Sequence, residues 1–263
     1  MSLIGVFDSG LGGLTAVRRL LELLPREDIL YLGDTARVPY GSRSRDTIRK
    51  YAREDAHFLL SHSVDAIMVA CNTVSSSALG DVREVSGTVP VFDVVEPPAI
   101  RAARVTQNGK IAVLGTAATV RSGAYERELG NLDRFDVISV ACPLFVPLAE
   151  AGRVDANDVA VRAIASDYLQ AVRDFGADTV ILGCTHYPLL RDAIGAILGD
   201  GVTLIDSGAV AAEDVAAILG LHGADAELGT VRFCVTDDPE SFRDNASLFL
   251  GREIDGVEQV RLG

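Results

Sequence analysis

Short runs of β-branched and apolar residues alternate with longer amphipathic stretches along almost the whole chain. The short runs cover residues 3–7, 29–32, 65–70, 90–93, 110–114, 136–140, 179–182 and 202–205. Alternation of this kind, with helical patterns between most of the runs, is typical of βαβ units that build parallel sheets. The sequence therefore predicts an α/β fold made of doubly wound parallel sheets.

Two breaks in this pattern indicate how the chain is divided. Residues 96–98 (Glu-Pro-Pro) interrupt the backbone after the fourth run, and a new strand-Gly-Thr unit begins at residue 110. A second crossing is expected near residues 206–208, before a helix over 209–220. We expect two similar α/β domains related by pseudo-symmetry, with the active site in the cleft between them. The predicted boundaries are 1–95 plus 209–263 for the discontinuous first domain and 96–208 for the inserted second domain.

Two of the apolar runs end at a cysteine that is followed by small polar residues. Cys71 precedes Asn-Thr and Cys184 precedes Thr-His. Each cysteine should lie at the carboxyl end of a buried parallel strand, where open α/β sheets place their ligand sites. The neighbouring hydroxyls and helix-start amides are expected to lower the thiol pKa from about 8.5. Two such thiols from two halves of one protein predict a pair of acid/base groups that face each other across a cleft.

Charge and composition exclude several classes of function. The formal net charge of −13 argues against general binding to nucleic acid or anionic lipid, because both need a basic surface. No apolar run reaches about 18 residues, and the first residues lack the basic region of a secretory signal, so we expect a cytoplasmic protein without a membrane span. Free thiols are then expected at all four cysteines, which show no CxxC spacing, and Cys142 and Cys234 are expected to be structural.

Two loops after the first strands carry the residues of a ligand site. Residues 8–15 (Asp-Ser-Gly-Leu-Gly-Gly-Leu-Thr) expose glycine amides to an anion at a helix start. They partly match a dinucleotide fingerprint with Asp34 as its acidic residue, although Thr15 replaces the third glycine. Asp8 as a plain helix cap is the simpler alternative. The loop over 33–42 suits recognition of a carboxylate or ammonium group, and a solvated loop is its alternative.

The cysteines admit other interpretations. Cys71, Cys184 and His186 could bind zinc, although Cys-x-His is a poor ligand spacing. Cys184 and His186 could form a papain-like nucleophile, which leaves the second thiol without a role and lacks an identifiable orienting group. Either cysteine could also be an inert small hydrophobic residue.

The ordered set of motifs carries more information than any one of them. The motifs are Asp8–Gly13, Gly33–Gly41, Ala70–Thr73, Gly115-Thr116 with Thr119, Cys142–Leu144 with Glu150, Gly183–Pro188 and Asp206–Gly208. Together, over about residues 3–215, they resemble glutamate racemases of the aspartate/glutamate racemase superfamily.

This resemblance implies an isomerase that interconverts L- and D-glutamate without a cofactor and supplies D-glutamate for peptidoglycan synthesis, as a homodimer with no bound metal. It implies that Cys71 and Cys184 are the acid/base thiols and that Asp8 and His186 orient them or help to deprotonate them. It also implies that Glu150 is a further active-site acid. The implied substrate-binding residues are Asp8, Ser9, Pro39, Tyr40, Gly41, Ser42, Cys71, Asn72, Thr73, Thr116, Thr119, Cys184, Thr185 and His186. Alternatives are an aspartate racemase, a single-thiol decarboxylase of the same superfamily, and a binding protein without catalytic activity.

Overall fold

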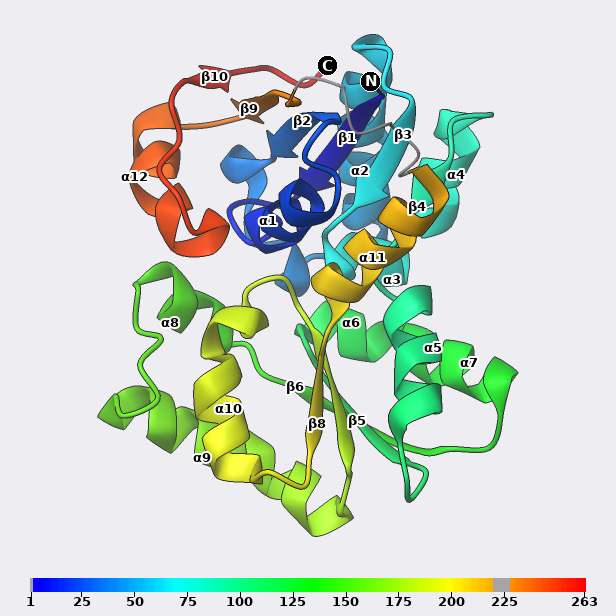
Figure 1. Cartoon of the computed structure of the whole chain (residues 1–263), viewed down its shortest axis with the longest axis vertical. Helices are drawn as coiled ribbons and strands as arrows, with labels where there is room; N and C mark the ends of the chain where they lie inside the picture. The colour runs from blue at the N-terminus through cyan, green and yellow to red at the C-terminus, as the bar shows by residue number, and fades with distance from the viewer. Residues whose placement is uncertain (1, 220–227) are drawn as a thin grey trace.

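All strands of the described structure belong to two parallel sheets. The computed structural model describes residues 2–219 and 228–263. The larger sheet has the order β10 (Val257–Gln259), β9 (Val231–Val235), β2 (Asp28–Gly33), β1 (Leu3–Asp8), β3 (Ala66–Val69), β4 (Val91–Phe92). The smaller has the order β6 (Asp136–Ala141), β5 (Lys110–Gly115), β7 (Thr179–Gly183), β8 (Thr203–Asp206). Figure 1 shows the larger sheet with its helices above the smaller one, and both termini in the upper domain.

The two sheets share one strand order. The sequence β2-β1-β3-β4 in the larger sheet corresponds to β6-β5-β7-β8 in the smaller one, and β9 and β10 extend the edge next to β2. Every pairing is parallel. Cys71 and Cys184 therefore follow equivalent strands, β3 and β7, of two similar halves. The predicted α/β class with two doubly wound parallel sheets is confirmed.

Helices cover both faces of the larger sheet because both faces of its strands are apolar. Ile4 and Val6 of β1 pack in a cluster with α1 (Leu14–Leu23), α11 (Ser207–Leu219) and α12 (Pro239–Leu250). Phe7 belongs to the cluster on the opposite face, which includes α2 (Arg45–Ser61), α3 (Asn72–Ser77) and α4 (Leu79–Ser86). A strand buried on both faces shows a continuous apolar run, which is why β1 was recognisable in the sequence.

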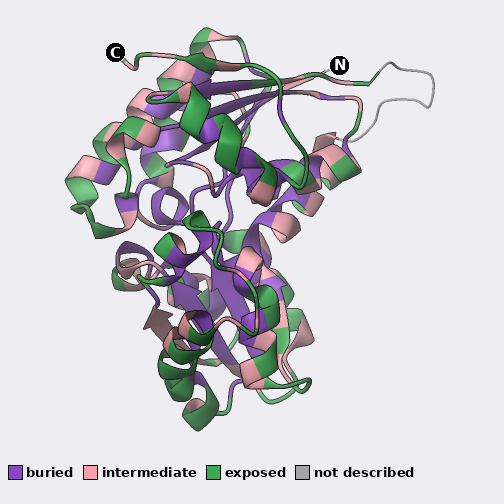
Figure 2. Ribbon diagram, turned by 90° about the vertical axis from the view of Figure 1, so that its left-hand side faces the viewer, coloured by how far each residue is buried: buried purple, intermediate pink, exposed green. Residues whose placement is uncertain are grey.

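The smaller sheet is covered in the same way. One face packs against α8 (Phe145–Glu150), α9 (Val159–Phe175) and α10 (Arg191–Leu198), and the other against α5 (Glu96–Val105) and α7 (Ala124–Leu132). The short α6 (Ala117–Ser122) begins after β5, next to α3 of the other domain. Figure 2 shows the buried residues gathered in both sheets and in the loops where the domains meet.

The strand runs expected from the sequence agree with the structure within a few residues, and β9 and β10 are additions to them. The expected helix over 209–220 begins earlier, at Ser207, and its last residue lies outside the described part of the chain. The boundaries 1–95 plus 209–263 and 96–208 stay a prediction. All strands of the larger sheet fall in the first two ranges and all strands of the smaller sheet fall in the third.

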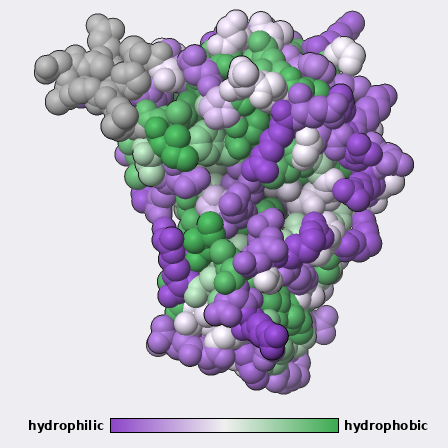
Figure 3. All heavy atoms as spheres, turned by 90° about the vertical axis from the view of Figure 1, so that its right-hand side faces the viewer, coloured by the Kyte–Doolittle hydropathy of each residue, from purple (hydrophilic) through white to green (hydrophobic). Residues whose placement is uncertain are grey.

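The surface carries both hydrophilic and apolar side chains. Hydrophilic side chains cover much of the face in Figure 3, with separate apolar groups between them. Within residues 2–219 and 228–263, no helix combines the length and apolar character that a bilayer crossing requires.

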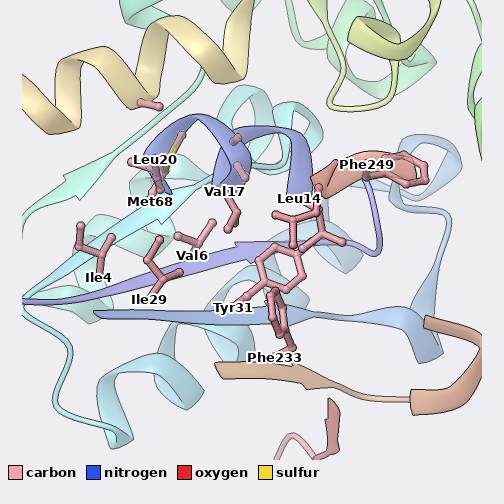
Figure 4. Close-up of a cluster of buried hydrophobic side chains, with 14 of the residues drawn as sticks. Ile4, Val6, Leu14, Val17, Leu20, Ile29, Tyr31, Met68, Phe233 and Phe249 are labelled. Carbon is pink, nitrogen blue, oxygen red and sulfur yellow. The ribbon is translucent and has the colours of Figure 1, made fainter. Parts of the chain in front are cut away.

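The packing of α1 on the larger sheet can be tested at Leu20. Its side chain is fully buried, and Figure 4 shows it facing the strands that carry Ile4, Val6 and Met68. Leu20→Ala should lower the free energy of unfolding by about 2–5 kcal/mol, because it removes buried methyl groups and leaves a cavity. Leu132→Ala is the control, since Leu132 is 47% exposed, and it should change the free energy by less than about 0.5 kcal/mol. Urea denaturation of both variants measures the difference, and equal midpoints would contradict it.

Candidate active site

A cavity of about 380 Å³ lies between the two domains. Each segment of its wall follows the carboxyl end of a parallel strand: β1, β2, β3, β5, β6 or β7. The lining residues are Ser9, Gly10, Val38, Pro39, Tyr40, Gly41, Ser42, Cys71, Asn72, Thr73, Thr116, Ala117, Pro143, Val146, Pro147, Glu150, Cys184, Thr185 and His186. Loops that leave the sheets at this edge thus bring polar side chains from both domains to one space.

Close approach of the two domains at this cavity requires glycine. A Cβ atom on Gly12 would lie 2.1 Å from Thr185 Oγ1 and 2.5 Å from His186 Nδ1. The Thr15 hydroxyl also donates to the carbonyl of Thr185 at 3.1 Å. Gly41 plays the same part on the other side, where its Cβ would lie 2.7 Å from Cβ of Thr116. The glycines of the first two loops therefore allow the domains to touch, in addition to any contact with a ligand.

The Cys71 thiol is buried next to a carboxylate. Cys71 caps the start of α3, and its Sγ lies 3.9 Å from Ser9 Oγ. Burial and the nearby Asp8 charge raise the pKa of Cys71, and the backbone amide of Val74 only partly offsets them. The expected lowering of this pKa by helix-start amides is therefore wrong for Cys71. Its thiol form is the stable one when the site is in this state.

Asp8 lies behind the cavity wall. Its Oδ2 accepts a hydrogen bond from the Gly10 amide at 3.0 Å. Its Oδ1 is buried and has no hydrogen-bond partner among the described residues. Asp8 does not cap the first helix, whose N-cap is Gly13 with no side-chain bond. A buried carboxylate oxygen without a partner is costly, so this position needs a reason other than local structure.

Cys184 lies in a different electrostatic environment from Cys71. His186 Nδ1 is 4.0 Å from Cys184 Sγ, and His186 Nε2 is 3.0 Å from Glu150 Oε1. Burial lowers the pKa of His186, but the contacts with Cys184 and Glu150 outweigh burial and raise the pKa to about 10. His186 is then a cation at neutral pH. The two thiols thus have different neighbours, since Cys71 is buried near the Asp8 carboxyl and Cys184 lies beside the His186 ring.

Polar side chains join the domains on either side of the thiols. Thr73 Oγ1 lies 3.0 Å from Thr116 Oγ1, which in turn lies 3.0 Å from Thr119 Oγ1. The Asn72 amide donates to Tyr125 Oη at 3.0 Å and to Ser207 Oγ at 2.9 Å. Asn72 lines the cavity, and its buried Oδ1 lacks a hydrogen-bond partner in the part of the chain that the structure describes. A buried amide oxygen without a partner is costly, so this position, like that of Asp8, needs a reason other than local structure.

The loop after β2 supplies a continuous part of the wall, residues 38–42. The hydroxyl of Tyr40 donates to Asp34 and Asp55, so it is directed away from the cavity. Asp34 is fully buried and also accepts from Arg37 and Thr236. Its oxygens are thus taken by side chains, which argues against the dinucleotide interpretation that used Asp34 as the ribose partner.

The structure brings all the predicted site residues to this cavity wall except Asp8 and Thr119, which stand directly behind it. Sequence reasoning from the residues did not single out Val146 and Pro147 of α8, which line the cavity beside Glu150. The sequence feature that could have identified them is their position after β6, at the sheet edge that also carries Cys184. It also missed Tyr125 and the contact of Ser207 with Asn72.

The zinc interpretation lacks a ligand set. Across residues 2–219 and 228–263, no three His, Cys, Asp or Glu side chains are grouped so that they could hold a metal ion. All four cysteines are free, as expected, and all four are buried.

Comparison with known proteins decides the family. The model of the family described as Asp/Glu/Hydantoin racemase matches residues 4–215. The chain belongs to this family. The resemblance seen in the motifs is thereby confirmed.

Close relatives and solved structures agree with this assignment. The chain is 46% identical to the glutamate racemase of Chlorobaculum tepidum over 261 residues, which is 98% of this chain and 95% of that protein. The crystal structure of Francisella tularensis glutamate racemase in complex with D-glutamate matches with a TM-score of 0.92 at 39% identity, over 99% of this chain and 97% of that one. The Thermus thermophilus glutamate racemase in complex with beta-chloro-D-alanine matches with a TM-score of 0.87 at 47% identity, over 98% and 96%.

The contact between Glu150 and His186 generates a test by titration. Glu150→Gln removes the carboxylate beside His186 Nε2, so the pKa of His186 should fall below about 10. Histidine NMR measures it, with the His62 resonances as internal control. In the wild type, the stability that protonated His186 provides is fully present below about pH 6.5 and is lost as the pH rises through about 10. An unchanged His186 titration in the variant would show that Glu150 does not hold this proton.

Proposed function

We propose that this protein interconverts L- and D-glutamate, with Cys71 and Cys184 as opposed acid/base groups and without a cofactor. One observation carries the proposal: two buried thiols from equivalent strands of two similar domains line one cavity, one next to Asp8 and the other next to a cationic His186. Two-sided proton exchange needs one protonated and one deprotonated group at the start, and the different neighbours of the two thiols support such an arrangement.

The proposed reaction moves one proton off the substrate and another onto it. The thiolate of one cysteine takes the α-proton, so an S–H bond forms and the Cα–H electron pair remains on the substrate as a carbanion. The thiol of the other cysteine then gives its proton to the opposite face of Cα, and becomes a thiolate. The enzyme leaves the reaction with the two protonation states exchanged, ready for the reverse direction.

Charged neighbours suit this exchange of states. His186 Nδ1 lies 4.0 Å from Cys184 Sγ and can exchange a proton with it, whereas burial near Asp8 favours the thiol at Cys71. Hydroxyls of Ser9, Thr73 and Thr185 on the cavity wall can donate to carboxylate oxygens, where the carbanion charge is delocalised.

The residues at the cavity offer no anchor for imine chemistry. The chain's lysines are Lys50 and Lys110, and neither lines the cavity. We propose that the acidity of the α-proton comes from electrostatic stabilisation within the site.

The wider role follows from the family resemblance. We propose that the product D-glutamate is used for peptidoglycan synthesis, that the enzyme is cytoplasmic, and that it is a homodimer. The substrate assignment rests on relatives named glutamate racemase, of which the Francisella protein was solved with D-glutamate.

A thiol nucleophile is the second candidate, and the geometry gives it one specific argument. Glu150 orients His186, which lies beside Cys184, so the three residues have the arrangement of a nucleophile, a base and an orienting carboxylate. This interpretation gives no role to Cys71 or to the buried Asp8. Acyl transfer at Cys184 would survive the loss of Cys71, whereas racemisation would not.

Single cysteine variants separate the two mechanisms. Cys71→Ser and Cys184→Ser should each lose nearly all racemisation in both directions, because each direction uses both thiols and an alcohol is a much weaker acid. Circular dichroism with pure L- or D-glutamate measures the rates. Racemisation within a few-fold of the wild type in either variant would remove that cysteine from the mechanism.

Solvent exchange in D2O gives an independent readout. The wild type should place deuterium at Cα of the product enantiomer, since its thiols exchange with solvent. Each serine variant keeps one thiol and should exchange the α-proton slowly, with retention, for one enantiomer only. The two variants should prefer opposite enantiomers, which mass spectrometry and NMR of the recovered amino acid can establish. The same preference in both variants would contradict opposed thiols.

Substrate size should matter at the wall formed by residues 38–42. Glutamate should be racemised far faster than aspartate, because one methylene in a shaped pocket is worth about 1–3 kcal/mol. Values of kcat/KM for both amino acids measure this preference. Equal values would indicate a broader racemase.

A further inference from the structure

A cluster of buried charges lies directly behind the cavity wall. It consists of Asp34, Arg37, Tyr40, Glu54 and Asp55, and we call it the Arg37 cluster. Asp34 and Asp55 are fully buried, and the side chain of Arg37 is only 19% exposed. The racemisation mechanism uses none of the charged members of this cluster.

The guanidinium group of Arg37 contacts three carboxyl groups. Arg37 Nε contacts Asp34 Oδ2 at 2.5 Å, its Nη2 contacts Asp55 Oδ1 at 3.0 Å, and its Nη1 donates to Glu54. The Tyr40 hydroxyl bridges the two buried aspartates. Arg37 Cζ lies over the ring of Tyr51, 4.1 Å from the ring centroid, so this ring also packs against the cluster.

Stability alone is a weak reason for such a cluster. Removing several charges from water is costly, and well-packed apolar residues of similar volume often serve stability equally well. Burial, and after it the charge of the nearby Asp34, raise the pKa of Asp55 well above its usual value. Unlike apolar side chains, charged and hydroxyl groups form directed hydrogen bonds and so fix the orientation of the groups that they join.

These bonds are directed at the backbone that forms the cavity wall. Residues 38–42 line the cavity between Arg37 and the start of α2, and the Tyr40 hydroxyl ties them to Asp55 on that helix. On the other side, Asp34 accepts from Thr236, whose Oγ1 also accepts from the Ala36 amide at 2.9 Å. The wall is thus fastened to α2 and to the end of β9.

A small shift of this wall would change the site. Gly41 packs so closely on Thr116 of the other domain that even a Cβ atom would have to displace it. Thr116 is in turn bonded to Thr73, which follows Cys71 and Asn72 on the chain. The position of residues 38–42 therefore sets how the domains meet across the substrate space.

We propose that Arg37 and Asp55 are positioning residues that hold the wall of residues 38–42 in place and thereby set the affinity for substrate. This proposal rests on the proposed glutamate racemisation. Neither residue lines the cavity, so both act through Tyr40 and the backbone that it anchors.

The test separates binding from chemistry. Arg37→Lys keeps the charge but loses the fork that reaches three carboxylates. We expect KM for D-glutamate to rise about tenfold, while kcat falls less than about threefold. Asp55→Asn should change KM in the same direction, and it carries the test if Arg37→Lys does not fold. Arg53→Lys is the matched control, because Arg53 is also on α2 and contacts two carboxylates, Asp81 and Glu84, away from the cavity.

A double-mutant cycle tests the route through Tyr40. If the hydroxyl acts through Asp55, the effects of Tyr40→Phe and Asp55→Asn on KM should not add. Additive effects would mean that Tyr40 and Asp55 act on the substrate independently, which would overturn the proposal.

The same measurements distinguish a failure of this positioning proposal from a failure of the proposed function. If Arg37→Lys and Asp55→Asn lower the melting temperature but leave KM within about twofold of the wild type, the cluster is only structural and the proposal is wrong. An equal rise of KM in Arg53→Lys would also overturn it. Absence of racemisation by the wild type, in the same assay, would instead reject the proposed function.

Discussion

Parallel pairing of every strand is the constraint on which this site depends. In a parallel sheet all carboxyl ends lie at one edge, so the loops after β1, β2 and β3 are neighbours, as are those after β5, β6 and β7. The two edges then face one cavity. Glycine at positions 12 and 41 lets the opposing loops come within contact distance, because a side chain at either would overlap atoms of the other domain.

The two thiols occupy equivalent positions on similar backbones, but the charged side chains near them differ. Cys71 and Cys184 follow equivalent strands, yet Cys71 is buried near Asp8 and Cys184 lies beside His186. Desolvation penalises a thiolate wherever no cation is near, so thiols at equivalent positions of two similar domains differ electrostatically only when their neighbours differ. Glu150, on α8 of the second domain, adds to this difference by holding the proton on His186.

The cavity is also bounded by groups that no ligand needs to touch. The Arg37 cluster fixes one wall from behind, and the packing of Phe249 of α12 against the His186 ring, with 5.3 Å between centroids, constrains another. Helix α12 comes from the C-terminal part of the chain, which returns to the first domain after the second is complete. Both domains and both ends of the chain thus contribute to the position of the side chains at the cavity.

The sequence by itself determined the α/β class, most strands, the placement of both cysteines at strand ends, and the family, because these depend on local periodicity and on ordered motifs. It did not determine the charge at each thiol. Helix-start amides suggested a lowered pKa for Cys71, but burial near Asp8 has the larger effect, and burial is a property of the packed chain. The sequence also did not predict that Glu150 contacts His186, 36 residues away. Nor did it predict that the Tyr40 hydroxyl points away from the cavity and contacts Asp55. These are contacts between distant segments, and only the docking of the two sheets decides them.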